Sequence, residues 1–287
     1  SKEVMEFHRY APGVPQAEEW GRVYRRYMAS LSSLEQDPFK HSTGPNRNLV
    51  DLVWVLEMKR AGIISEDTAR RLLKAIRSIQ SGNVEVTDTE SHGYAERNLI
   101  EALGGDEDLA STVNLGRTLQ EPMSRLDLRD RLLETIDELV NLIDTVLTVA
   151  RKNTATIMPG HTHMSHAQPI TLAAYMISVS DGLFRSLRLL EVAYDFTNLN
   201  TGGCGATSGI TWPINREHMA EMLGFDGVVE PAYDAEASQD HSLAILAGLN
   251  SLMVLLSRTS MDFGIWSMEE VGMIEVDPSW CGVSSMM

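Results

Sequence analysis

Cysteine and basic residues are scarce in this chain, and each shortage excludes a class of protein. The 287 residues include two cysteines, Cys204 and Cys281, which cannot build a disulfide framework or a cysteine-ligated zinc finger. A reducing compartment, the cytoplasm, is therefore expected. Lys and Arg number 24 against 40 Asp and Glu, so the net charge of −16 disfavours attraction to phosphate backbones. We expect a small-molecule partner and no nucleic acid.

Long apolar runs are also lacking. No stretch approaches the roughly 20 apolar residues that a membrane-spanning helix needs. Residues 1–6 do not contain the short apolar core of a signal peptide. With 43% hydrophobic and 22% charged residues, the composition is that of an ordinary globular chain of one or two domains. We therefore expect no membrane partner.

The chain instead shows helical periodicity. Apolar residues recur every three to four positions and strict two-residue alternation is missing, so the predicted fold class is all-α. Two long helices are apolar nearly all round, which predicts an elongated bundle of long helices that oligomerises. We place a smaller N-terminal helical domain at residues 1–116, and a long-helix bundle domain, incomplete at its C-terminal end, at residues 117–287. The predicted helices are residues 17–31, a hairpin over 49–81, 90–104, 117–153, 171–199, 216–223 and 235–268.

Three histidines, His161, His163 and His166, lie within six residues between two predicted long helices. Prolines and a glycine on either side break the helical pattern, so an irregular segment is expected. The His-x-His-x-x-His spacing could ligate a metal, although no cysteine or carboxylate flanks it. The rings could also hydrogen-bond helix ends, or one could act as a general acid or base near neutral pH. Acid–base work is the preferred interpretation, and we predict no metal and no cofactor.

Other polar groups lie near predicted helix ends. Asn114, Arg117 and Thr118 precede the first long helix, where side-chain donors and backbone N–H groups would make a carboxylate receptor. A plain helix-entry loop is the alternative. The glycine-rich residues 202–209 match no nucleotide-binding fingerprint. Residues 284–285 are two serines in a Gly-flanked tail, which on composition alone indicates a disordered end.

Several of these segments together resemble the fumarase/aspartase superfamily, most closely its argininosuccinate lyase branch. Met-Pro-Gly-His-Thr-His at residues 158–163 is similar to that branch's Met-Pro-Gly-Tyr-Thr-His, and Ala-Gln-Pro follows in both. The last four residues look like the opening of the superfamily's Ser-Ser-x-Met-Pro-x-Lys-x-Asn signature. The matching segments occur in the family's order at residues 158–163, 167–169, 212–217, 223–227 and 284–287, within a resemblance that covers about residues 49–287.

The resemblance implies a homotetramer with active sites shared between subunits, and an elimination that releases fumarate from a succinyl group carried on nitrogen. Ser284 would remove the Cβ proton, and His163 would assist proton transfer. Because the match stops inside the signature, we expect the natural chain to continue beyond Met287. The residues implied to bind an N-succinyl amine substrate are Thr162, His92, Asn114, Arg117, Thr118, Gln168 and Ser285.

Departures from the family pattern concern the way the amine is held. Leu119 and Gln120 stand where argininosuccinate lyases usually have arginine and asparagine, and Gln239 replaces another arginine. Leucine cannot reproduce the bidentate pairing of arginine. The identity of the leaving amine therefore stays open. Argininosuccinate is the first candidate substrate. The alternatives are an aminopolycarboxylate, adenylosuccinate-type cleavage and a non-catalytic, crystallin-like scaffold.

Overall fold

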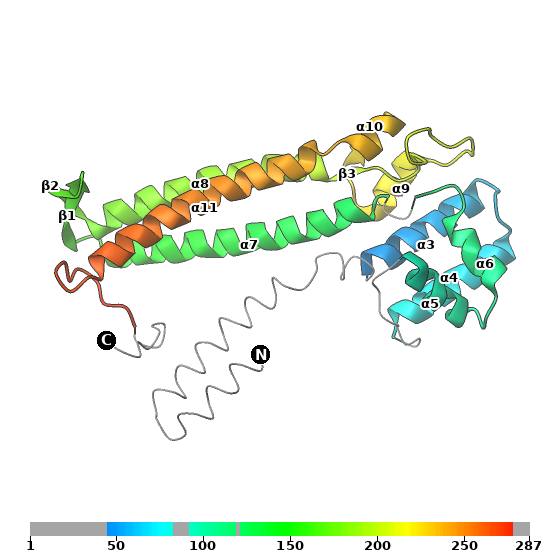
Figure 1. Cartoon of the computed structure of the whole chain (residues 1–287), viewed down its shortest axis with the longest axis horizontal. Helices are drawn as coiled ribbons and strands as arrows, with labels where there is room; N and C mark the ends of the chain where they lie inside the picture. The colour runs from blue at the N-terminus through cyan, green and yellow to red at the C-terminus, as the bar shows by residue number, and fades with distance from the viewer. Residues whose placement is uncertain (1–44, 83–91, 119–120, 278–287) are drawn as a thin grey trace, which may run out of the picture. The chain divides into compact units, whose positions relative to one another are not determined.

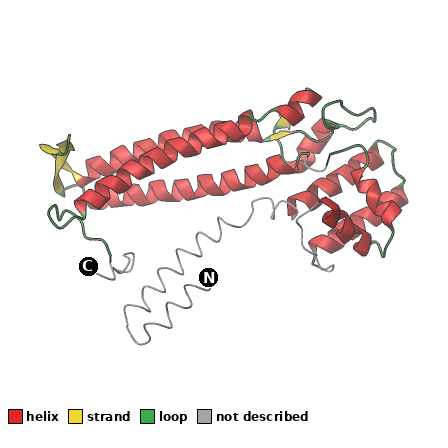
Figure 2. Ribbon diagram, viewed as in Figure 1, coloured by secondary structure: helices red, strands yellow, loops and turns green. Residues whose placement is uncertain are grey.

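The structure is a computed structural model that describes residues 45–82, 92–118 and 121–277. The described residues up to Leu256 belong to one compact unit, and residues 257–277 belong to a second. Helices make up nearly all of the regular structure, as Figure 2 shows in red, which confirms the all-α class. The predicted helix at residues 17–31 lies outside the described residues. The predicted domain boundary after residue 116 stays a prediction.

The first helices pack around a core of their own. Gly62, with a φ of 73°, makes the turn of the predicted helical hairpin. Ser65 then begins the second helix by accepting the backbone N–H of Thr68. Trp54 and Leu72, both fully buried, join the two helices in the core. The elements of this group are α3 (Pro45–Arg60), α4 (Glu66–Gln80), α5 (His92–Ala102), α6 (Glu107–Ser111) and the 3-10 turn η1 (Thr112–Asn114).

Two long helices follow, α7 (Met123–Lys152) and α8 (Leu172–Thr197). The first begins at Met123 and not at residue 117 as predicted, because Pro122 has no N–H and disfavours helical geometry in the residue before it. Its amphipathic pattern is as predicted: Leu132, Leu139, Ile143 and Val146 are buried, and the acidic residues at positions 134, 137, 138 and 144 are all exposed. Figure 1 shows α7 and α8 running side by side.

The histidine segment between these helices is a β-hairpin, so the expectation of an irregular segment is wrong. Strands β1 (Ile157–Thr162) and β2 (Ser165–Thr171) pair antiparallel. The turn residues His163 and Met164 have φ values of 50° and 64°, as in the two-residue turns whose twist matches paired strands. At least half of the side chains in each strand are exposed, so the alternation that marks a half-buried strand is missing from the sequence.

A glycine-rich loop leads from α8 to the last helices. The helix predicted over residues 235–268 is interrupted, because Ser238 has an extended ψ of 133° and its hydroxyl donates to the Asp240 carboxylate at 2.5 Å. The predicted short helix at residues 216–223 is confirmed. The elements are β3 (Leu199–Asn200), α9 (Arg216–Leu223), β4 (Gly227–Val228), which pairs in parallel with β3, α10 (Ala232–Ala237) and α11 (Asp240–Trp266).

Helices α8 and α11 approach closely at two glycines. A Cβ on Gly182 would lie 2.6 Å from Leu255 Cδ2, and a Cβ on Gly248 would lie 2.6 Å from Leu190 Cδ2. Any larger side chain at these positions would displace a packed leucine. The two glycines therefore allow α8 and α11 to pack directly, as Figure 1 shows.

The same helix also exposes apolar side chains. Leu243, Leu246 and Met253 are 65%, 60% and 60% exposed, and their spacing places them on one face of α11. By length and composition, the stretch Ala232–Trp266 is long and apolar enough to cross a membrane, and 11% of an apolar 18-residue part of it is buried. The expectation that no stretch approaches that length is therefore wrong. A helix covered by other subunits of an oligomer has the same composition.

Candidate functional site

One face of α3 holds the loop of residues 114–118, which precedes α7. Asp51 and Trp54 lie on that face, about one turn apart. The Arg117 guanidinium donates a hydrogen bond to the Asp51 carboxylate. The Trp54 indole N–H donates to the carbonyl of Leu115 at 3.1 Å. The loop is therefore anchored to the core of the first helices at two points.

Polar atoms without a protein partner gather on this loop. Within the described part of the chain, Asn114 Oδ1, Arg117 Nε and Nη1, and Thr118 Oγ1 are buried and make no hydrogen bond. The Arg117 side chain is only 2% exposed. Buried polar groups are normally paired, so these atoms indicate a ligand that pairs with them. Two guanidinium N–H groups beside a hydroxyl suit a carboxylate.

Gly116 lets this loop pass close to an aromatic ring. Its φ is 70°, a left-handed conformation that favours glycine. A Cβ at this position would lie 2.6 Å from Trp212 Cζ3. The segment that carries Trp212 is held in turn by Glu57 of α3, which is fully buried, accepts the Asn215 N–H at 3.2 Å and pairs with His218 Nδ1. The same helix thus positions the loop and the residues packed on it.

Asp51 and Glu57 are positioning residues that the sequence analysis missed. A signal was present, because both are acidic residues inside the apolar run of residues 49–58, where a charge needs a partner. The identity of that partner could not be read from the sequence. Arg117 follows Asp51 by 66 residues, and His218 follows Glu57 by 161.

A second group of predicted site residues lies on the β1–β2 hairpin. Thr162, His163 and Gln168 are all exposed there. His161 and His166 face each other across the strands, with ring centroids 5.1 Å apart in an edge-to-face arrangement. His163 lies at the tip, in the turn itself and outside the paired register. The predicted substrate contacts of this group stay predictions.

Helix α7 separates the two groups. The loop of residues 114–118 precedes its first residue, and the hairpin follows its last. With 30 residues and a rise of 1.5 Å per residue, α7 is about 45 Å long. Figure 1 shows the hairpin and α3 at opposite ends of it. The structure therefore does not bring Arg117 and His163 together within one chain, and a site that uses both needs more than one copy.

Three predicted site residues cannot be placed. Ser284 and Ser285 lie outside the described residues. Helix α5 is described from His92 onward, but the side chain of His92 lies outside the described part of the chain. The predicted roles of all three stay predictions.

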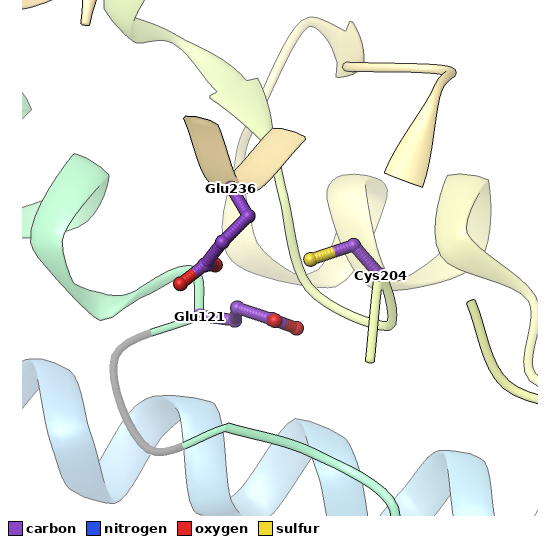
Figure 3. Close-up of side chains that lie close together, drawn as sticks. All are labelled: Glu121, Cys204 and Glu236. Carbon is purple, nitrogen blue, oxygen red and sulfur yellow. The ribbon is translucent and has the colours of Figure 1, made fainter. Parts of the chain in front are cut away.

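A further cluster was not predicted. Glu121, Cys204 and Glu236 come from three separate segments, and one side-chain O or S atom of each lies within 4.8 Å of the others (Figure 3). Burial raises the pKa of the Cys204 thiol, and interaction with the Glu121 carboxylate raises it further. Burial and the Glu121 charge also raise the pKa of the Glu236 carboxyl. The Cys204 thiol and the Glu236 carboxyl are therefore both held toward their protonated forms.

Comparison with known proteins places the chain among lyases. A lyase family model matches residues 38–287. The chain is 34% identical to an argininosuccinate lyase of Methanosarcina barkeri over 244 residues, which are 83% of this chain and 49% of that protein. The chain thus spans about half the length of the curated relatives it matches.

Solved structures give a similar result. An EDDS lyase in complex with formate is 27% identical, with a TM-score of 0.77 over 86% of this chain and 50% of the other. A variant of EDDS lyase with bound fumarate is 26% identical, with a TM-score of 0.78 over 96% of this chain and 54% of the other.

Proposed function

Because the chain belongs to the lyase family, within the argininosuccinate lyase branch of the fumarase/aspartase superfamily, we propose that the protein releases fumarate from an N-substituted aspartate. The names of its relatives support this substrate class, since they include argininosuccinate lyase and an EDDS lyase with bound fumarate. The observation that carries the proposal is the set of buried, unpartnered polar atoms on Asn114, Arg117 and Thr118. A succinyl group presents two carboxylates, and this loop offers donors for one of them.

Binding would depend on local donors. The net charge of −16 repels anions at long range. Asp51 occupies Arg117 Nη2, which orients the guanidinium plane and leaves Nε and Nη1 for the ligand. Asp51 neutralises part of the local positive charge, but Arg47 adds a second guanidinium 3.6 Å from the same carboxylate.

The elimination itself requires a base at Cβ and stabilisation of the charge that forms on the adjacent carboxylate. Ser284, as its alkoxide, would take the Cβ proton, and the C–H electron pair would move into that carboxylate as an aci-carboxylate. Collapse of this species forms the C=C bond of fumarate and breaks the C–N bond. The amine leaves with the electron pair and gains a proton. Thr162 and His163 would contact the substrate and assist this transfer.

The proposal includes a homotetramer whose active sites are shared between subunits. The length of α7 supports shared sites, because the loop at one of its ends and the hairpin at the other cannot meet in one chain. The exposed apolar side chains of α8 and α11 support assembly, since such surfaces are usually covered by a partner. They include Ile177, Phe184, Leu189, Leu246 and Met253.

Fumarate formation tests the reaction. Purified protein is given argininosuccinate, EDDS and adenylosuccinate in turn, and fumarate is followed by its ultraviolet absorbance. We expect release from argininosuccinate or EDDS, and the ratio of kcat/KM values identifies the preferred amine. The absence of fumarate from all three substrates, with the oligomer intact, would refute the proposal.

A serine variant separates catalysis from a scaffold role. Ser284→Ala should abolish fumarate release and leave the oligomeric state unchanged, because it removes the proposed base. Ser285→Ala, its matched neighbour, should reduce turnover less, because it removes a substrate contact. Equal activity in Ser284→Ala and the unmodified protein would exclude Ser284 as the base.

A further inference from the structure

The cluster of Glu121, Cys204 and Glu236 joins three parts of the fold. Glu121 stands two residues before α7, Cys204 lies in the glycine-rich loop after β3, and Glu236 is on α10. One side-chain O or S atom of each lies within 4.8 Å of the other two, and Figure 3 shows the three side chains close together. The geometry points to a binding site for a divalent cation of the zinc class, ligated by the Cys204 thiolate and the two carboxylates.

Glu121 supplies the observation that calls for a ligand. It is 3% exposed, and its Oε1 accepts the Ala206 N–H at 2.9 Å. Its other oxygen, Oε2, is buried and receives no hydrogen bond from the described residues. Leaving a buried carboxylate oxygen unpaired costs free energy. A cation would satisfy Oε2, while the Ala206 N–H would orient the carboxylate from behind, as groups around metal ligands commonly do.

The donor set selects the kind of cation. Thiolate sulfur favours softer ions than magnesium or calcium, and carboxylate oxygens alongside it suit zinc or cobalt. Zn–S and Zn–O bonds of about 2.3 and 2.0 Å put tetrahedral ligand atoms about 3.5 Å apart, so the side chains would need to close by roughly an ångström. Glu236 is exposed and can move. The exposed edge of the cluster, where Glu236 lies, would also give the ion a path of entry and leave room for water as a fourth ligand.

The nearby Arg216 guanidinium does not occupy the proposed cation position. The Arg216 guanidinium acts on the Cys204 thiol through its charge. Its N–H groups, however, donate to the carbonyl oxygens of Gly202, Val229 and Glu230 at 3.0, 2.8 and 2.9 Å. Arg216 therefore braces the loop around the cluster. On ion binding, the thiol would release its proton to solvent and the carboxylates would share the positive charge.

Cobalt binding tests the proposal without reference to fumarate release. Chelator-treated protein is titrated with Co²⁺, and the thiolate-to-cobalt charge-transfer absorbance is recorded. We expect one equivalent per chain and displacement of the signal by Zn²⁺. Cys204→Ala should abolish the signal, and Cys281→Ala, the matched control, should retain it. No signal in the unmodified protein, its survival in Cys204→Ala, or its loss in Cys281→Ala would overturn the site.

A second variant, at the exposed ligand Glu236, tests the site even if Cys204→Ala fails to fold. Glu236→Gln changes a surface side chain, and its folding can be checked by circular dichroism. It should weaken cobalt binding roughly tenfold or more, because it removes a charged ligand. Asp234→Asn is the matched control, because Asp234 is a neighbouring acidic residue outside the cluster, and it should leave the affinity unchanged. Equal affinity in Glu236→Gln and the unmodified protein would overturn the three-ligand site.

Discussion

Replacing Arg117 by lysine and by methionine separates the two tasks that the structure gives to this side chain. Nη2 pairs with Asp51, and Nε and Nη1 have no partner among the described residues. A lysine ammonium can keep the pair with Asp51, but it cannot also present a planar fork to a ligand carboxylate. Methionine fills a similar volume and performs neither task. The two variants should therefore differ in stability and resemble each other in activity.

The expected stability change follows from burial. Methionine would leave the Asp51 side chain, 9% exposed, with Arg47 at 3.6 Å as its described ion-pair partner. Removing one partner of a buried pair costs about 3–5 kcal/mol. Because Arg47 stays in place, we expect about 3 kcal/mol, a fall in Tm of roughly 5–10 °C. Lysine should cost about 1 kcal/mol or less, since the pair with Asp51 survives.

The expected loss of activity is similar in both variants. Hydrogen bonds to a charged ligand contribute about 1.5–3 kcal/mol, which corresponds to roughly a 10- to 100-fold fall in kcat/KM. Initial rates of fumarate release and thermal denaturation by circular dichroism measure the two effects. Arg71→Lys is the matched control, because Arg71 pairs with Asp106 at the surface and should change neither. Full kcat/KM in Arg117→Lys would refute the receptor and leave Arg117 a structural role alone.

Three other perturbations test the fold. Gly116→Ala should destabilise the protein by about 2 kcal/mol or more in urea unfolding, because its Cβ would meet the Trp212 ring at 2.6 Å and φ is 70°; an unchanged midpoint would contradict the close approach. Leu246→Glu should shift the proposed oligomer toward monomers in light scattering, since a partner would cover this 60% exposed side chain. Burial lowers the pKa of His241 from 6.5, so the unfolded chain binds more protons and stability should fall as pH drops below 6.5. His241→Leu should flatten that slope, and retention of the full slope would assign it to other groups.

The helices were predictable from the sequence because their signals are local. The turn at Gly62, the cap at Ser65 and the stripe that includes Leu139 and Ile143 depend on neighbours within a few residues. The β1–β2 hairpin was not predicted, because its segment lacks the local signals of paired strands. Strands with exposed side chains carry no apolar alternation, and the turn residues His163 and Met164 are not one of the Asn-Gly or Asp-Gly pairs that signal such turns.

The sequence by itself determined the all-α class, the family and the residue types of the candidate receptor. Periodicity and contiguous motifs record these features directly. Only the tertiary structure decided which groups meet: Asp51 with Arg117, Glu57 with His218, and Glu121 with Cys204. It also showed that α7, which is about 45 Å long, lies between the receptor loop and the hairpin. Such pairings join residues far apart in the chain, and they form because burial leaves each polar group few partners within reach.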